Sequence, residues 1–174
     1  MAGLVLGPLL RYAGTEEATI WVETDSACTV EVRIEGAPEC TRRTFGVGGH
    51  HYALVHCKGL EPDSAAPYEV LLDGERAWPE AGSDFPASVV RTHSGARGDA
   101  TRILFGSCRV AAPHEPPYSL RKDEDPRGRE VDALIAIAQR MAKRPAEEWP
   151  HALLLLGDQV YADECSPGVR EFIR

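Results

Sequence analysis

The chain has 174 residues, of which 43% are hydrophobic and 26% charged, as in an ordinary globular protein. Its 19 basic and 27 acidic residues give a net charge of −8, which argues against a general binder of nucleic acids or membrane surfaces, because both need clustered basic residues. No window reaches the roughly 18 uninterrupted apolar residues of a membrane span, and the N-terminus has neither a signal peptide nor a twin-arginine motif. As written, the sequence predicts a cytoplasmic protein, or an exported one if an upstream segment is missing.

Residues 1–93 have the pattern of a β-rich domain. Short segments of β-branched and aromatic residues alternate with turn signals and show no helical period, which favours a sandwich of two sheets. The expected strands are 19–24, 29–34, 51–57, 67–72 and 87–92. We expect Trp21 to fill the core between the sheets. The run Gly59-Leu60-Glu61-Pro62 followed by Tyr68 resembles the corner of a fibronectin type III domain, in which a tyrosine hydroxyl binds back to the backbone.

The pattern changes after a linker at residues 94–100, which contains two glycines, one serine and two charged residues. In the region 101–174, two short apolar segments, 102–105 and 152–156, are typical of parallel strands that are buried on both faces. Between them, apolar residues at helical spacing predict a helix over 129–143, and a further helix begins near residue 166. A two-stranded parallel sheet cannot cover its own apolar faces, so we expect this region to be the beginning of a larger α/β domain.

Each of the two parallel strands ends in a glycine followed by a possible metal ligand. The first leads into Gly106-Ser107-Cys108-Arg109 and the second into Gly157-Asp158-Gln159-Val160-Tyr161. Ligand sites in α/β sheets lie outside the carboxyl ends of the strands, so a shared site is expected there. A simpler interpretation is a buried Cys108, a turn-capping Asp158 and a packed Tyr161. The remaining cysteines, Cys28, Cys40, Cys57 and Cys165, have no metal-binding spacing and are interpreted as reduced thiols.

The order of a β-sandwich, a G-S-C-R strand end, a helix and a G-D-x-x-Y strand end resembles the alkaline phosphatase D (PhoD-like) family of metallophosphoesterases. The resemblance implies a fibronectin-like N-terminal domain followed by an α/β metallophosphoesterase domain. It implies that Cys108 and Tyr161 bind ferric iron and that Asp158 bridges the iron to a divalent metal, with calcium expected. Asp158 and Arg109 would then be catalytic residues, with Arg109 binding a phosphate oxygen, although a surface ion pair is the alternative for Arg109.

The implied function is metal-dependent hydrolysis of a small phosphate ester. The later ligand blocks of that family are absent, so we expect the chain to be an N-terminal fragment that needs the rest of its own catalytic domain and is inactive alone. The alternative is a β-sandwich binding module with a non-catalytic α/β tail. In either case, no membrane partner and no nucleic-acid-binding surface are expected.

Overall fold

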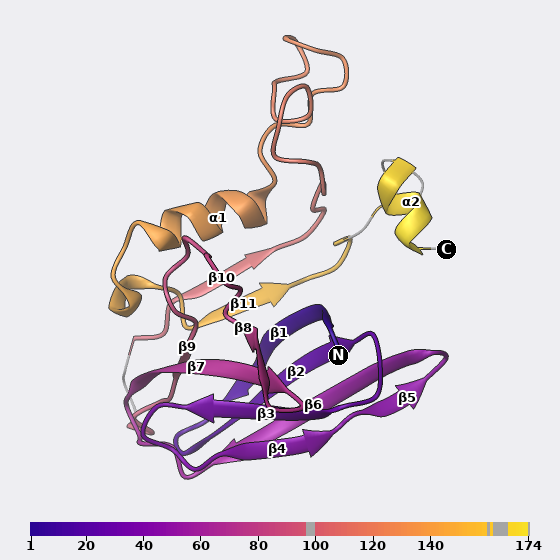
Figure 1. The fold of residues 1–174 in the computed structure, drawn as a ribbon. Helices are drawn as coiled ribbons and strands as arrows, with labels where there is room; N and C mark the ends of the chain where they lie inside the picture. The colour runs from indigo at the N-terminus through magenta and orange to yellow at the C-terminus, as the bar shows by residue number, and fades with distance from the viewer. Residues whose placement is uncertain (97–99, 160, 162–166, 174) are drawn as a thin grey trace. The chain divides into compact units, whose positions relative to one another are not determined.

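The computed structural model describes residues 1–96, 100–159, 161 and 167–173. The chain divides into two compact units, Met1–Asp99 and Ala100–Arg174 (Figure 1). None of the described helices has the length and apolar character needed to span a bilayer.

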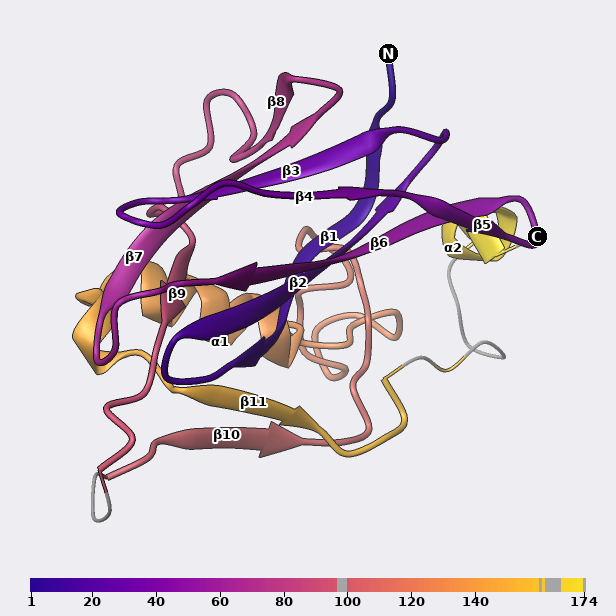
Figure 2. The same cartoon turned by 90° about the horizontal axis from the view of Figure 1, so that it is seen from below.

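The N-terminal unit is built from two antiparallel β-sheets (Figures 1 and 2). One sheet has the strand order β1-β2-β6-β5, and the other has the order β4-β3-β7-β8 with β9 paired to β7. The strands are β1 (Leu4–Ala13), β2 (Glu17–Thr24), β3 (Thr29–Ile34), β4 (Cys40–Arg43), β5 (Phe45–Val47), β6 (His50–Lys58), β7 (Ala65–Leu72), β8 (Glu75–Trp78) and β9 (Val89–Arg91). This arrangement confirms the expected β-sandwich.

The core of this unit is formed by strands in which buried residues alternate with more exposed ones. Every second residue of β2 and β3 is fully buried, including Ile20 and Val22 in β2 and Val30 and Val32 in β3. Successive strand residues point to opposite faces, so these positions all face the opposing sheet. Mostly small and branched side chains fill the space between the sheets, together with the aromatic ring of Tyr68.

The prediction that Trp21 occupies the core is wrong. Trp21 lies between Ile20 and Val22, so its side chain points to the outer face of β2. It is half-buried there and stacks on Tyr52 of β6, with the ring centroids 5.8 Å apart. The aromatic character of Trp21 indicated burial, but the residue parity of the strand decided its direction.

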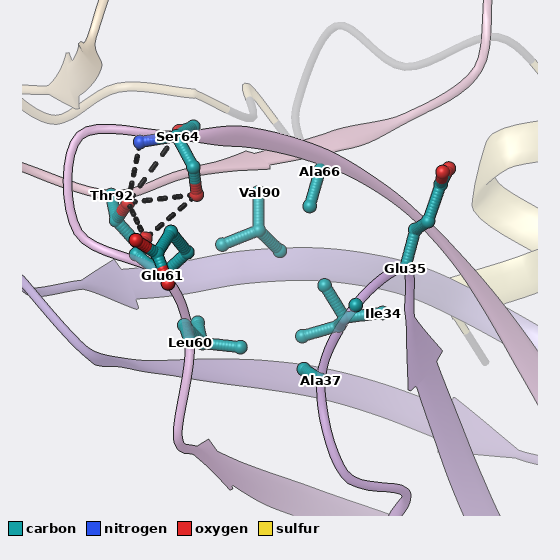
Figure 3. A pocket seen from close by; sticks show the side chains of 10 residues that line it. Ile34, Glu35, Ala37, Leu60, Glu61, Ser64, Ala66, Val90 and Thr92 are labelled. Carbon is teal, nitrogen blue, oxygen red and sulfur yellow. Dashed lines mark hydrogen bonds between the residues drawn. The ribbon is translucent and has the colours of Figure 1, made fainter.

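The prediction of a tyrosine corner is also wrong. The Tyr68 hydroxyl binds the side chain of Ser88, downstream in the chain, rather than the backbone of the preceding corner. Thr92 closes that corner instead: its hydroxyl donates to the Glu61 carbonyl (2.6 Å) and accepts from the Ser64 N–H (3.0 Å). Figure 3 shows these three residues at one side of a small cavity of about 100 Å³ whose wall includes Leu60 and Val90. A buried threonine hydroxyl can hydrogen-bond to the backbone groups of the corner as well as a tyrosine hydroxyl can.

The C-terminal unit contains a βαβ arrangement. Strands β10 (Ile103–Gly106) and β11 (Ala152–Leu155) pair in parallel, with Ile103 opposite Ala152 and Gly106 opposite Leu155. Helix α1 (Ala133–Ala142) and a short 3₁₀ helix, η1 (Ala146–Glu148), lie between the strands in sequence, and α2 (Pro167–Ile173) follows them. Helix α1 begins later than predicted, because the N-cap of the helix is Asp132, whose side chain accepts from the Leu134 N–H (2.9 Å).

The short parallel sheet keeps apolar side chains in contact with solvent, as the sequence predicted. Leu153, Leu154, Leu155 and Leu156 are 46–62% exposed, and Phe105 of β10 is 74% exposed. The expected α/β phosphoesterase architecture is not evident among the described residues, which contain a single parallel strand pair. Two strands and a few short helices have too little surface to bury both faces of such a sheet.

Candidate metal centre

The loops that follow β10 and β11 run side by side beyond the ends of the strands. The Leu156 N–H donates to the Gly106 carbonyl (2.9 Å), and the Cys108 N–H donates to the Gly157 carbonyl (3.3 Å). The Arg109 N–H then donates to the Asp158 carbonyl (2.9 Å). These backbone hydrogen bonds continue the parallel pairing into the loops and bring the two expected ligand positions together.

Three side chains meet where the loops are joined. The Cys108 Sγ lies 3.7 Å from the Asp158 Oδ2, which suits two ligands of one metal, because metal–ligand bonds of about 2.0–2.3 Å allow a separation of up to about 4.5 Å. The Tyr161 side chain hydrogen-bonds to both Cys108 and Asp158. Cys108 and Tyr161 are exposed, so the group is open to solvent. The structure therefore brings together all three residues that the sequence suggested as ligands.

Both loops hold non-glycine residues in the left-handed backbone region. Cys108 has φ of +56° and Asp158 has φ of +49°, and Gly157 beside Asp158 has φ of +121°. Aspartate tolerates this conformation through its short polar side chain, but cysteine does not share that advantage. Such strain costs of the order of 1 kcal/mol and concentrates at functional sites. The strain at Cys108 and Asp158 supports a role for their side chains beyond packing.

The crowding of ionisable groups perturbs the Tyr161 phenol. The hydrogen bond to Cys108, loss of hydration and the charge of Asp158 raise the pKa of Tyr161 to about 12. The neutral phenol is favoured because neighbouring negative charge opposes its ionisation. A multivalent cation would reverse this balance by neutralising the charges of a thiolate, a carboxylate and a phenolate at once. The donor set therefore fits a metal ion of high charge that accepts sulfur and phenolate ligands.

The three side chains supply only part of a coordination shell. Among the described residues, no group of three or more histidine, cysteine, aspartate and glutamate side chains is close enough to hold a metal ion. Cys108 and Asp158 are only two side chains of these types, and Tyr161 adds a phenol donor of a different type. Additional ligands would be needed to complete the shell.

Arg109 is part of an ion pair. Its Nε and Nη2 groups donate to the Asp132 carboxylate at distances of 2.7–3.1 Å. The Asp132 side chain is 1% exposed and also caps α1, so one carboxylate holds both the helix and the loop after Cys108. The ion pair that the sequence left as the alternative for Arg109 is therefore present. Asp132 was missed as a site residue, although an aspartate directly before an apolar helical pattern is a recognised N-cap signal.

A cavity of about 390 Å³ lies next to Cys108 within the C-terminal unit. Its wall is mostly apolar and includes Phe105, Val131, Leu134 and Ile137, while Arg109 contributes a charged group. A cavity of this composition can take an organic group of moderate size beside the three converging side chains.

The comparison with known families matches residues 1–90 to the family described as "Domain of unknown function (DUF7800)". No curated protein and no solved structure gives a significant match. The expected membership of the alkaline phosphatase D family is wrong, because the matching family is a different one. That expectation depended on the order of a β-sandwich, a helix and two short strand-end motifs, and such an order of common elements can occur in unrelated proteins. The chain belongs to the family described as "Domain of unknown function (DUF7800)", whose region covers the β-sandwich.

Proposed function

We propose that Cys108, Asp158 and Tyr161 belong to the metal centre of a metal-dependent hydrolase of phosphate esters. The observation that carries this proposal is the convergence of three ionisable side chains at the ends of two parallel strands, with Cys108 Sγ 3.7 Å from Asp158 Oδ2. Strand β10, helix α1 and strand β11 would then be part of an α/β phosphoesterase domain. The strained backbone at Cys108 and Asp158 supports the same proposal.

The donor chemistry favours ferric iron at Cys108 and Tyr161, with Asp158 shared with a second, divalent ion such as calcium. Thiolate and phenolate are strong donors to Fe(III), whereas Mg²⁺ prefers carboxylates and retained water. Such ions would supply Lewis acidity toward phosphate oxygens and lower the pKa of bound water.

Arg109 and the apolar cavity beside Cys108 would then contribute to binding of the substrate. Asp132 fixes the Arg109 guanidinium through Nε and Nη2, and this pairing does not involve Nη1. An arginine held in this way could donate to a phosphate oxygen through Nη1, which lies outside the ion pair. The apolar cavity beside Cys108 suits the organic part of an ester.

The metal site is tested on the 174-residue chain by titration with Fe(III) under air. Coordination of phenolate and thiolate should give a visible charge-transfer band at one iron per chain. Tyr161→Phe should abolish or shift this band, and Tyr12→Phe, which alters an exposed tyrosine of β1, should leave it unchanged. Equal bands in wild type and Tyr161→Phe would contradict the assigned ligand.

The hydrolytic function is tested with a protein that contains residues 1–174 and is supplied with iron and calcium, on an aryl phosphate and an aryl phosphodiester. We expect turnover that is lost in Asp158→Asn. Absence of metal-dependent turnover on both substrates would contradict the proposal. Absence of iron binding as well, with an intact sandwich, would favour the alternative of a binding module.

A further inference from the structure

The two outer faces of the sandwich differ in chemistry, and one of them is apolar. In the sheet β1-β2-β6-β5 (Figure 2), residues that pair across strands lie on the same face, and those between the buried positions of β2 and β6 point outward. Leu9, Trp21 and Leu54 form the central row of this apolar face. All of its apolar side chains are exposed except Trp21 and Tyr52, which are half-buried. Its other members are Leu6, Tyr12, Phe45 and Val47.

The outer face of the other sheet carries charged side chains instead. Arg33 of β3 forms ion pairs with Glu31 of the same strand and with Glu69 of β7. Covering such a face would remove charges from water at a cost. An exposed apolar surface as large as a sheet is rare on a monomeric protein and marks an interaction site. The apolar face is therefore the surface of the sandwich that a partner would cover.

The charges within the apolar face indicate what kind of partner fits. The Glu23 carboxylate accepts from His50 Nδ1 (2.6 Å), and the Glu17 carboxylate accepts from His56 Nε2 (2.9 Å). With Lys58, the outward residues of β2 and β6 hold one basic and two acidic groups, a charge of −1 when histidine is neutral, against −8 for the whole chain. A second copy of the chain therefore meets little repulsion here, whereas an anionic membrane or a nucleic acid would need a cluster of basic residues.

The size of the apolar face is sufficient for a dimer. Four strands about 4.8 Å apart and eight residues of about 3.4 Å each give a projected area of roughly 500 Å². Two copies would bury roughly 1,000 Å² in total, the amount at which specific interfaces begin. A two-fold axis across the strands at the central row would place Trp21 and Leu54 against the same residues of the other copy. The same axis would bring Lys58 toward the Glu23–His50 pair of the other copy, so that unlike charges meet.

We propose that the apolar face binds the same face of a second copy, so that the chain forms a homodimer through two stacked sheets. Stacked sheets lie about 10 Å apart with their strands roughly aligned, and the side chains of both inner faces interdigitate. Leu9 and Leu54, which are exposed in the single chain, become part of an apolar layer between two sandwiches. Glu17 and Glu23 keep their hydrogen bonds to the histidines, so both carboxylates remain paired when the layer forms.

The test follows the mass of the 174-residue chain by sedimentation velocity over a range of protein concentrations. We expect a reversible equilibrium between monomer and dimer. Cys108→Ser and Cys165→Ser form the background, because Cys108 is exposed and could link copies by a disulfide, and Cys165 lies outside the described residues. The free thiols that remain are buried, and they belong to Cys28, Cys40 and Cys57.

A charge in the centre of the apolar face should prevent dimerisation. Leu54→Lys should raise the dissociation constant at least about 100-fold, because a two-fold interface would bury the unpaired charge twice. Leu154→Lys in β11 is the matched control, since Leu154 is 46% exposed and Leu54 is 47% exposed. This control should leave the dissociation constant unchanged.

A cross-link tests the same arrangement and remains informative if Leu54→Lys fails to fold. Leu54→Cys in the same background is treated with a bifunctional maleimide of about 10 Å span, which matches the separation of stacked sheets. We expect covalent dimers from Leu54→Cys and none from Glu31→Cys, which alters the charged face. Three results would each overturn the proposal: a chain that is monomeric at every concentration, a dimer that Leu154→Lys disrupts and Leu54→Lys does not, and equal cross-linking of the two cysteine variants.

Discussion

The Sγ of Cys108 lies 3.7 Å from the Oδ2 of Asp158, although the two residues are 50 positions apart in the chain. Parallel pairing of β10 with β11 produces this contact, because it places the carboxyl ends of both strands at one edge. The backbone hydrogen bond from Arg109 to Asp158 then keeps the two loops in register. The contact between Cys108 and Asp158 is therefore a consequence of the strand pairing.

The first prediction concerns the acidity of Tyr161. Its pKa of about 12 should fall toward the usual value near 10 in Cys108→Ala, which removes the largest cause of the shift. Asp158→Asn should lower the pKa as well, since it removes a negative charge that opposes ionisation. The measurement is a pH titration followed by NMR of ring-labelled tyrosine, in which the other tyrosine signals are internal controls. An unchanged Tyr161 midpoint in both variants would show that the three side chains do not interact.

The sequence predicted which three side chains would converge at this site, but it did not predict the ion pair that holds the neighbouring loop. Strand-end position and residue type were sufficient to indicate Cys108, Asp158 and Tyr161, because parallel strands deliver their carboxyl ends to a common edge. Arg109 was assigned to a phosphate oxygen with an ion pair as the alternative, but its partner was not identified, since nothing in the local sequence shows that Asp132 lies within reach. That pairing depends on where α1 begins, and Glu130, with φ of +63°, delays its start beyond the predicted residue.

The second prediction concerns the Arg109–Asp132 pair. Burial alone would raise the pKa of Asp132, but the hydrogen bonds from Arg109 and the Leu134 N–H lower it below its usual value of 3.8. The resulting stabilisation is present above the unfolded-state pKa and is lost as the pH falls through the lower folded-state pKa. Asp132→Ala removes both the cap and the ion pair, and should destabilise α1 by about 2 kcal/mol at neutral pH.

The measurement for this pair is urea unfolding of the whole chain, followed through the Trp149 indole signal. Trp149 reports on α1 because its Nε1 donates to the Met141 carbonyl (2.8 Å) at the end of the helix. The difference between wild type and Asp132→Ala should shrink below about pH 4. A constant difference down to acidic pH would show that the charge of Asp132 contributes nothing.

The third prediction separates the two faces of β2. Ile20→Ala should destabilise the sandwich by about 3 kcal/mol, because it opens a cavity at a fully buried position. Trp21→Ala should cost only about 1 kcal/mol, since it removes a half-buried ring and its stacking on Tyr52. Thermal unfolding followed by far-ultraviolet circular dichroism measures both. A larger loss for Trp21→Ala would restore the interpretation that this tryptophan belongs to the core.

Ile20 and Trp21 also show which features of the sandwich the sequence could not predict. Period-two patterns were sufficient to locate the strands around Ile20 and Val32, because alternation is a local property. Which side chains face inward depends on the opposing sheet, and the sequence of one strand does not contain that information when both of its faces carry apolar residues. Trp21 was assigned by its size, whereas the structure fills the same layer with Ile20 and Val22.

The fourth prediction concerns Gly128, in the loop before α1. A Cβ at this buried position would lie 2.4 Å from the Arg121 carbonyl oxygen and 2.6 Å from that of Leu120. Because both contacts are with backbone atoms, the loop must move, and Gly128→Ala should destabilise the C-terminal unit by roughly 2 kcal/mol. Gly168→Ala is the control, since a Cβ there meets nothing within 4 Å. Equal urea midpoints for the two variants, read from the Trp149 signal, would contradict this account.

The last prediction tests the backbone strain at Cys108. Cys108→Gly and Cys108→Ala both remove the thiol, so any difference between them reports the backbone. At φ of +56° glycine is unstrained and alanine is not, so the glycine variant should be more stable by about 1 kcal/mol. Ser107 is the matched control, because it does not have positive φ, and there the alanine variant should be the more stable of the two. Urea unfolding monitored at Trp149 measures all four. If alanine is favoured at both positions, the left-handed conformation of Cys108 stores no strain, and the support that it lends to the metal centre is withdrawn.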